Sequence, residues 1–211
     1  EWLLVLKSHT QIKFSDDFQQ QLDTLTAPLP EQSVEGYLLP DTYYFVAQTA
    51  AIEIIKRAHL NMQQYLENAW QNRALDLPYN TAYEGLIMAS IIEKETGDAK
   101  ERPRISGVFV NRLNLKMRLQ TDPTIIYGMG ENFDGDIRRK DIRAATPYNT
   151  YVIKGLPPTP IAMPSKLAID AAFNPIATEE LYFVSKGDGS HKFSTTLHEH
   201  NLAVRQYQLN K

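Results

Sequence analysis

The stretch from Thr81 to Gly97, TAYEGLIMASIIEKETG, constrains the fold of this chain most. Thr81 and Glu84 have the Ser/Thr-x-x-Glu spacing of a capping box, which predicts a helix beginning there. Gly97 follows the last periodic residues and is expected to end the helix in the left-handed conformation. Between these ends, six apolar residues leave the helix no polar face for almost two turns: Leu86, Ile87, Met88, Ala89, Ile91 and Ile92. A helix that is apolar on all sides is buried. We therefore expect this helix at the centre of the core.

Glu93 comes directly after the apolar run and continues the stripe of Leu86, Ala89 and Ser90 at helical spacing. A carboxyl group on a packed face loses water, and desolvation raises its pKa toward a value that suits a general acid. The alternative is a partly exposed glutamate paired with a nearby Lys or Arg. Glu95 lies about 200° further round the helix, so the two acids are not expected to share one cleft.

Composition excludes several classes of function. The 211 residues have a formal charge of −3 and are 43% hydrophobic, which is typical of a soluble globular protein. The mild acidity, with no basic block, argues against a nucleic-acid partner. The chain has no Cys, which excludes disulfides and thiolate chemistry. No apolar run reaches the length of a membrane span. The first residues, Glu1-Trp2, stand inside an amphipathic helical pattern without a Met, so we expect a fragment of a longer protein.

The remaining pattern predicts an α+β fold with many helices and one hairpin. Helices are expected near residues 2–6, 16–25, 50–70, 103–113 and 166–173, and in a last segment that begins with a second capping box, Thr196 with Glu199. Residues 35–45, EGYLLPDTYYF, are aromatic and β-prone. Residues 181–185 and 191–194, joined by a Gly-Asp-Gly turn, predict a β-hairpin. Pro28 and Pro30 mark a linker after the first module.

Two further stretches hold candidate site residues. Asp122 precedes Pro123, and this pair is typical of a helix start with Asp as N-cap, so Asp122 has a structural interpretation as well as a functional one. Residues 148–164, YNTYVIKGLPPTPIAMP, contain four Pro, two Tyr and one Asn. Such a loop is preformed, and its aromatic and amide groups suit sugar rings. A static surface connection is the alternative.

Several familiar chemistries are absent from the sequence. No G-x-S-x-G, S-x-x-K, P-loop or G-x-G-x-x-G pattern occurs, which weakens serine hydrolase, nucleotide and dinucleotide interpretations. His198 and His200 are two residues apart, unlike the i, i+4 pair of a zinc site. We expect no metal and no cofactor, and we interpret most histidines as structural. His191 is different, because it stands on the predicted hairpin beside aromatic residues.

Six motifs occur in the order typical of one family: EGYLLPDTYYF, ASIIEKET, VFVNRL, LQTDPTIIYG, YNTYVIKGLPP and LYFVSKGDGSHKFS. Together they resemble the YceG-like family of endolytic murein transglycosylases, over residues 34–207. The resemblance implies a mostly helical catalytic domain with small β elements at 35–211. It also implies that residues 1–34 are the remnant of a LysM-like module and a linker. The chain has Thr159 where the family usually has Gly.

The resemblance also implies an activity and a set of site residues. The activity is cleavage of the β-1,4 bond between N-acetylmuramic acid and N-acetylglucosamine in nascent peptidoglycan, leaving a 1,6-anhydromuramic end. The family's catalytic glutamate falls on Glu93. The substrate-binding positions fall on Gln120, Asp122, Tyr148, Asn149, Tyr151 and His191. A lytic transglycosylase needs one carboxyl group, because the C6 hydroxyl of the muramic residue is the nucleophile, whereas ordinary glycosidases use two.

Two alternatives remain at this point: a non-catalytic peptidoglycan-binding or scaffolding protein, and a hydrolysing muramidase with Asp122 as second carboxylate. The family implies the outer, periplasmic face of the cytoplasmic membrane, with an N-terminal anchor absent from this chain. Its expected partners are glycan strands and peptidoglycan synthases, including penicillin-binding proteins.

Overall fold

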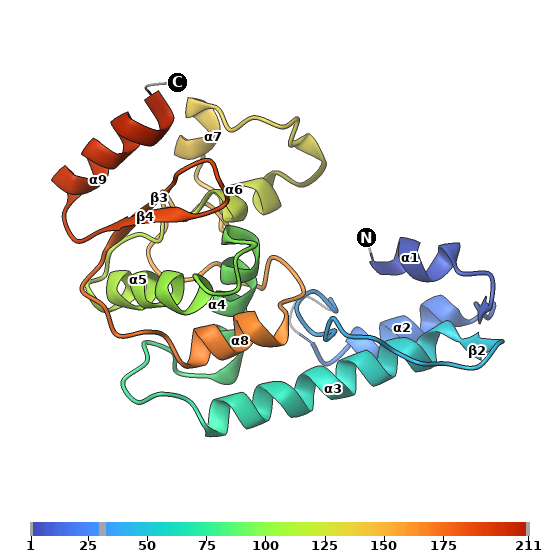
Figure 1. Cartoon of the computed structure of the whole chain (residues 1–211). Helices are drawn as coiled ribbons and strands as arrows, with labels where there is room; N and C mark the ends of the chain where they lie inside the picture. The colour runs from blue at the N-terminus through green and yellow to red at the C-terminus, as the bar shows by residue number, and fades with distance from the viewer. Residues whose placement is uncertain (1, 30–32, 210–211) are drawn as a thin grey trace.

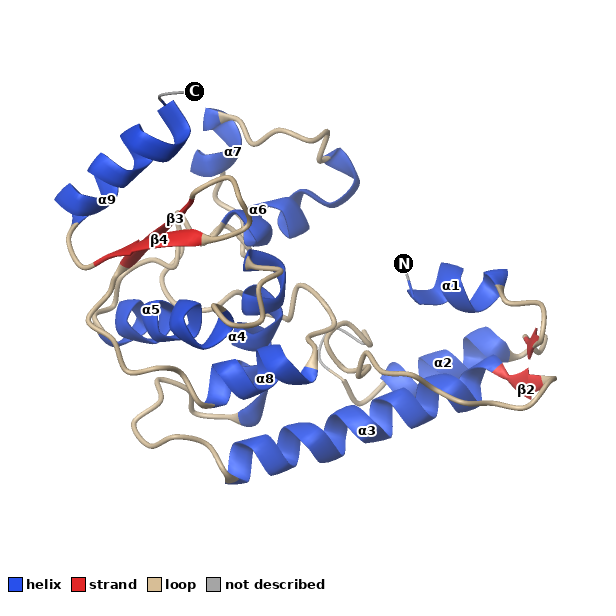
Figure 2. Cartoon of the chain, in the orientation of Figure 1, coloured by secondary structure: helices blue, strands red, loops and turns tan. Residues whose placement is uncertain are grey.

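The computed structural model describes residues 2–29 and 33–209, and Figure 1 shows their arrangement. Helices predominate, with two short strand pairs (Figure 2), so the predicted α+β class is confirmed. In chain order the elements are α1 (Trp2–Ser8), β1 (Ile12–Lys13), α2 (Phe18–Thr26), β2 (Thr49–Ala50), α3 (Ala51–Gln71), α4 (Ala82–Glu95), α5 (Arg102–Asn114), α6 (Asp122–Met129), η2 (Gly130–Asn132), α7 (Arg139–Arg143), α8 (Lys166–Phe173), β3 (Tyr182–Ser185), β4 (His191–Ser194), α9 (Leu197–Val204) and η3 (Arg205–Leu209).

Helix α4 is the centre of the larger core, as predicted. Every residue from Gly85 to Ile92 is buried. The helix packs against α3, α5 and above all α8. Gly85 permits the closest approach, because a Cβ at this position would lie 2.2 Å from the ring of the fully buried Phe173. The all-apolar sequence therefore forms a helix that other elements enclose on every side.

The ends of α4 differ in part from the expectation. The Thr81 hydroxyl accepts the Glu84 N–H at 3.2 Å, as predicted. The Glu84 carboxylate, however, accepts the N–H of Asn80. The prediction for Gly97 is wrong: it does not have a positive φ, and Thr96 ends the helix in an extended conformation with φ −143° and ψ 138°. An extended C-cap leads the chain away without the left-handed turn that favours glycine.

A second, smaller core lies at the N-terminal end of the long helix α3, the end that Figure 1 shows beside α2. Phe18 and Val34 pack there against Ile52 and Ile55 of α3. Strands β1 and β2 pair in parallel, with Ile12 opposite Thr49 and Lys13 opposite Ala50. These contacts join residues on both sides of position 34, and the domain boundary at that position remains a prediction. The β-prone stretch 35–45 forms no strand. Pro30 of the predicted linker lies outside the described residues.

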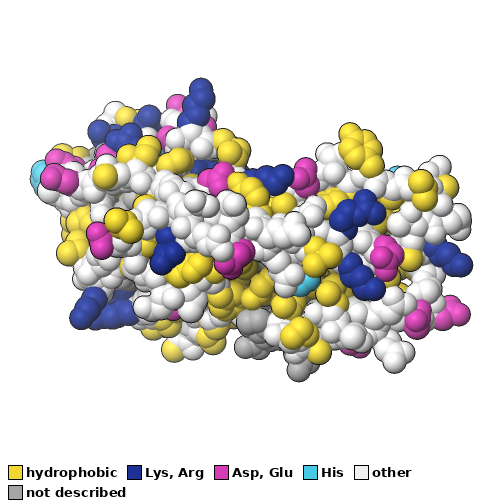
Figure 3. Space-filling view, turned by 90° about the horizontal axis from the view of Figure 1, so that it is seen from below, with side chains coloured by type: hydrophobic (Ala, Val, Ile, Leu, Met, Phe, Trp, Pro, Cys, Tyr) yellow, Lys and Arg dark blue, Asp and Glu magenta, His cyan; other side chains and the backbone are white. Residues whose placement is uncertain are grey.

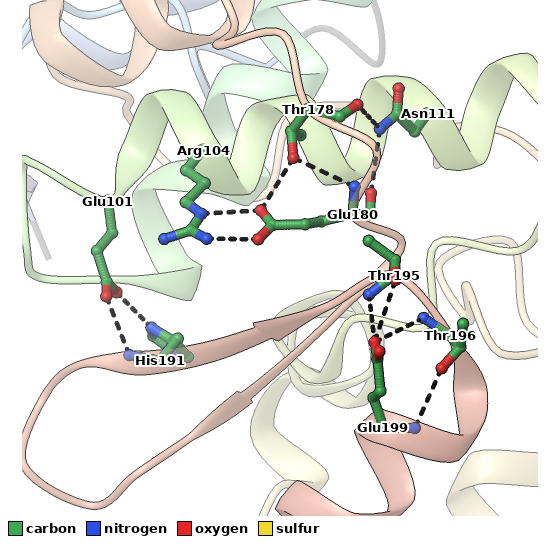
Figure 4. Close-up of polar contacts among 9 residues, drawn as sticks. All are labelled: Glu101, Arg104, Asn111, Thr178, Glu180, His191, Thr195, Thr196 and Glu199. Carbon is green, nitrogen blue, oxygen red and sulfur yellow. Dashed lines mark hydrogen bonds and ion pairs between the residues drawn. The ribbon is translucent and has the colours of Figure 1, made fainter.

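The C-terminal elements confirm the predicted hairpin and caps. Strands β3 and β4 are antiparallel, with Tyr182 opposite Ser194 and Ser185 opposite His191. The Ser165 hydroxyl caps α8 by accepting the Ala168 N–H. Thr196 and Glu199 form the complete capping box of α9 (Figure 4).

The surface is mixed in charge. On the face shown in Figure 3, side chains of Lys and Arg and of Asp and Glu are scattered among apolar and other residues. Over residues 2–29 and 33–209, none of the helices combines the length and the apolar character that a membrane crossing requires.

Gly85→Ala is expected to destabilise the fold, because the added methyl group would collide with the Phe173 ring inside a closed core. Overpacking of this kind costs about 1–3 kcal/mol. The matched control is Gly97→Ala, where no atom lies within 4 Å of the added Cβ. Urea denaturation of both variants measures the difference. Equal midpoints for the two variants would show that α4 and α8 are not in this close contact.

Candidate active site

A cavity of about 470 Å³ lies between the β3–β4 hairpin, α9 and the segment that leads into α6. Four of the residues predicted from the sequence line it: Gln120, Asp122, Tyr151 and His191. They come from segments far apart in the chain, so the fold brings most of the predicted set together. The glutamate that lines this cavity, however, is Glu95.

Glu95 is the last residue of α4, and its side chain is only partly exposed. Burial raises the pKa of its carboxyl group to about 7, and the negative charge of Asp122 acts in the same direction. The Thr121 hydroxyl and the Arg112 guanidinium act in the opposite direction and offset part of this shift. A carboxyl group with this pKa is partly protonated at neutral pH, which is the condition for a general acid.

Glu93 does not reach this cavity. Its carboxylate accepts three hydrogen bonds: from Arg102 Nη2 at 3.1 Å, from the Ser165 N–H at 3.0 Å and from the Ser165 hydroxyl at 2.5 Å. The side chain is 23% exposed and borders a different groove, of about 1020 Å³, beside Lys94 and Tyr127. The geometry matches the alternative interpretation of Glu93, a partly exposed residue paired with an Arg. The helical offset of about 200° explains why the two acids border different hollows.

Gln120 stands at the cavity in a strained backbone conformation, with φ +54°. Its N–H donates to the carbonyl of Thr150 at 3.1 Å, and its side-chain oxygen accepts from Arg112 Nη1 at 3.3 Å. A non-glycine residue in this region of φ costs free energy and persists where the surroundings fix it. These two hydrogen bonds hold Gln120 in this conformation at the cavity.

Arg112 is a cavity residue that the sequence analysis missed. It is 8% exposed, and it donates to the carbonyl of Leu181 at 2.6 Å and to that of Leu119 at 2.8 Å. It therefore joins the hairpin to the segment before α6, and its charge lies beside Glu95. The signal in the sequence is a charged residue within the helical stretch VFVNRL, where most of the neighbouring residues are apolar.

Asp122 is the first residue of α6, whereas the N-cap is Thr121, so the predicted N-cap is wrong by one position. The Asp122 carboxylate instead accepts a hydrogen bond from the Tyr151 hydroxyl at 2.7 Å. Burial and this hydrogen bond raise the pKa of Tyr151 well above its usual value. The pair forms one wall of the cavity and supplies fixed polar groups to it.

Tyr148 and Asn149 do not line the cavity. Asn149 is fully buried, where its Nδ2 donates to the carbonyls of Asp141 and Ala144 and its Oδ1 accepts the Tyr151 N–H at 3.0 Å. The Tyr148 hydroxyl bonds to that of Thr159 at 2.7 Å. Both residues therefore shape the loop that presents Tyr151. Thr159 supplies a contact that a glycine could not.

His191 begins β4 and is held by Glu101 (Figure 4). The Glu101 carboxylate accepts the His191 backbone N–H at 3.0 Å and contacts the ring Nδ1 at 2.6 Å. His200 also lines the cavity, with its ring stacked on Tyr182 at 5.2 Å. Burial and the nearby Arg112 lower the pKa of His200. Within residues 2–29 and 33–209, no group of three or more His, Asp or Glu side chains is placed to hold a metal ion.

Comparisons with known proteins identify the family of this chain. Residues 3–206 match the sequence profile of the YceG-like family, so the chain belongs to that family. The endolytic murein transglycosylase of Bacillus subtilis (strain 168) is 37% identical over 194 residues, which are 88% of this chain and 52% of that protein. The endolytic murein transglycosylase of Streptococcus pneumoniae serotype 2 is 32% identical over 180 residues, 82% of this chain and 32% of that protein. The chain thus spans about half or less of these curated relatives.

A solved structure agrees with the fold. The crystal structure of a yceG-like protein from Listeria monocytogenes superposes with a TM-score of 0.71 at 33% identity. The match covers 96% of this chain and 67% of that one.

Replacement of Glu95 is expected to change how stability depends on pH. Its pKa is about 7 in the folded protein, above the ordinary value of 4.5, so between these values the folded protein holds a proton that the unfolded chain releases. The free energy of unfolding therefore falls as pH rises from about 4.5 to about 7, by on the order of 3 kcal/mol. In Glu95→Gln this fall should disappear. Urea denaturation at several pH values measures it, and an unchanged pH profile would contradict the burial of this carboxyl group.

Glu93→Gln, in contrast, should lower the free energy of unfolding at neutral pH. It removes the charge that pairs with Arg102, which is largely buried. Loss of one member of such a pair leaves the other charge without compensation, and we expect a loss of about 2–4 kcal/mol at neutral pH. The same denaturation series measures this value. A stability equal to wild type would show that the Glu93–Arg102 pair is not formed in solution.

Proposed function

We propose, because the chain belongs to the YceG-like family, that it is a lytic transglycosylase acting within peptidoglycan strands. The reaction is cleavage of the β-1,4 bond between N-acetylmuramic acid and N-acetylglucosamine, with formation of a 1,6-anhydromuramic end. The relatives named above as endolytic murein transglycosylases support this activity. One observation of the structure supports it most: a single carboxyl group with a pKa of about 7 stands in the cavity that collects Gln120, Asp122 and Tyr151.

The proposal moves the acid from Glu93 to Glu95. Glu93 accepts hydrogen bonds from an arginine and from both donors of Ser165, so its lone pairs are already engaged. Glu95 faces the cavity, and the donor beside it is the Thr121 hydroxyl. A carboxyl group that must hold a proton and then release it needs the environment of Glu95 and not that of Glu93.

The chemistry then needs no second carboxylate. Protonated Glu95 donates its proton to the glycosidic oxygen as the bond to C1 of the muramic residue breaks. The resulting Glu95 carboxylate accepts the proton of the C6 hydroxyl as that oxygen closes on C1. Because the nucleophile belongs to the same sugar, its effective concentration near C1 far exceeds that of an external group. The acid is regenerated at the end of each cycle.

The side chains around Glu95 have matching roles. The Gln120 amide and the Asp122–Tyr151 pair supply hydrogen-bonding groups for the hydroxyl and acetamido groups of the strand. Arg112 stands beside Glu95 and stabilises the carboxylate that forms after proton donation. The position of Asp122 favours the alternative of a hydrolysing muramidase, because Asp122 is a second carboxylate at the cavity and its charge acts on Glu95.

The setting of the whole protein is part of the same proposal. We place it at the outer, periplasmic face of the cytoplasmic membrane, anchored by a segment outside this chain, where it would end strands made by peptidoglycan synthases such as penicillin-binding proteins. We assign residues 1–34 to the remnant of a LysM-like module and its linker. Residues 2–29 contribute to the small core at the N-terminal end of α3 and not to the larger core, which supports this assignment.

The test is digestion of purified glycan strands followed by mass spectrometry of the ends. Wild type should produce anhydromuramic ends, and Glu95→Gln should lower their rate of formation by about 10²- to 10⁴-fold, the usual contribution of a general acid. Glu93→Gln, assayed where it is folded, should keep most of the activity. Loss of cleavage in Glu93→Gln with normal cleavage in Glu95→Gln would overturn the assignment. Reducing muramic ends would indicate the muramidase, and strand binding without cleavage by wild type would indicate the binding protein.

A further inference from the structure

Helix α5 holds the segment that leads into β3 through a row of polar contacts with Thr178 and Glu180 (Figure 4). Arg104 forms a two-pronged ion pair with Glu180. Asn111 Nδ2 donates to the carbonyl of Thr178 at 2.7 Å and to that of Glu180 at 3.1 Å. These contacts end on backbone atoms or on side chains that do not line the cavity. Their role is to fix the hairpin on α5.

The contact of Glu101 is different, because it ends on a cavity side chain. Glu101 precedes α5, and its two oxygens engage the backbone N–H and the ring Nδ1 of His191. Both side chains are largely buried, at 16% exposed for Glu101 and 11% for His191. The His191 ring also packs edge-on against Phe183, with centroids 5.4 Å apart. The ring is therefore fixed in orientation from two sides.

This geometry determines which ring nitrogen carries the proton. A carboxylate only accepts hydrogen bonds, so the Nδ1 that contacts Glu101 at 2.6 Å carries a proton. In the neutral ring Nδ1 is then the one protonated nitrogen, and Nε2 is an acceptor. Among the described residues, no side chain or backbone group is a hydrogen-bond partner of Nε2, although His191 lines the cavity.

We propose that Glu101 is a positioning residue for substrate binding, which acts by holding His191 with its Nε2 as a hydrogen-bond acceptor in the cavity. This inference rests on the proposed function and deepens it. Nε2 accepts a hydrogen bond from a hydroxyl or an acetamido N–H of the glycan strand, since these are the donors that an amino-sugar polymer presents. Glu101 itself does not touch the substrate.

Glu101→Gln tests the proposal with little change of shape. The glutamine oxygen can still accept the His191 backbone N–H, but its NH₂ group must donate to Nδ1. The ring proton then moves to Nε2, which becomes a donor where the substrate needs an acceptor. A carboxylate-to-amide change at the histidine of a catalytic triad acts through the tautomer in the same way.

The matched control is Glu180→Gln. It weakens a second attachment of the hairpin region to the same helix, and Glu180 touches neither His191 nor the cavity. If Glu101 only anchors the hairpin, the two variants should have similar effects. If it positions His191, only Glu101→Gln should affect binding.

Two measurements decide between these outcomes. Nitrogen-15 NMR of the histidine rings, at a pH where His191 is neutral, should show the Nδ1–H tautomer in wild type and Glu180→Gln, and the Nε2–H tautomer in Glu101→Gln. In the Glu95→Gln background, which does not cleave, calorimetry with an oligosaccharide of alternating N-acetylglucosamine and N-acetylmuramic acid measures Kd. Glu101→Gln should raise Kd about tenfold, the effect of one hydrogen bond, and Glu180→Gln less than about twofold.

A cycle with His191→Ala tests whether Glu101 acts through the ring. In a His191→Ala background, Glu101→Gln should have no additional effect on Kd. The proposal is overturned if Glu101→Gln has the same His191 tautomer as wild type, if both hairpin variants raise Kd equally, or if the two effects simply add. Failure of the parent protein to bind the oligosaccharide would refute the proposed function, whereas the NMR result would still report on the Glu101–His191 pair.

Discussion

The complete enclosure of α4 is the constraint on which the rest of the structure depends. All residues from Gly85 to Ile92 are buried, and the ring of Phe173 lies directly on Gly85. The helix can neither rotate nor slide without exposing apolar surface or meeting this ring. Its last turn is therefore held in one orientation, and the directions in which Glu93 and Glu95 leave the core are fixed by packing far from either carboxyl group.

Two acids on one helical turn consequently have different chemistry. Glu93 meets Arg102 and Ser165, which supply three hydrogen-bond donors. Glu95 meets a cavity wall in which burial and Asp122 outweigh the opposing effects of Thr121 and Arg112, so that its pKa rises to about 7. Divergent environments for neighbouring carboxyl groups are a usual way to assign an acid role. Here the divergence follows from helix geometry, and the raised pKa belongs to the residue that faces the other predicted site residues.

The sequence was sufficient for the central helix and the hairpin but not for the choice between the two glutamates. The capping residues Thr81 and Thr196, the apolar run in α4 and the hairpin are local signals, and the structure confirms them. The helical offset correctly separated Glu93 from Glu95. It could not show which of the two glutamates borders the cavity, because the sequence of a helix that is apolar on every side does not indicate which face points toward a site. Gly97 and the β-prone stretch 35–45 were misjudged, because Thr96 ends α4 in an extended conformation and residues 35–45 form no strand.

The sequence also predicted some residues of the candidate site correctly and missed others. Gln120, Asp122, Tyr151 and His191 reach the cavity. Asn149 supports Tyr151 from inside the loop, a role that no sequence pattern distinguishes from substrate contact. Arg112 and Glu101 were missed because their partners, the Leu181 carbonyl and His191, are 69 and 90 residues away along the chain. Contacts at such separations become visible only when the hairpin is seated on α5 (Figure 4).

The most direct measurement is a crystal structure of the Glu95→Gln protein with an uncleaved glycan strand bound. The strand should cross the cavity between the hairpin and α6, with a glycosidic oxygen within about 3 Å of the substituted side chain, the reach of a proton donor. A strand that lies along the groove beside Glu93, with no sugar near the end of α4 that faces the hairpin, would contradict the assignment of the acid.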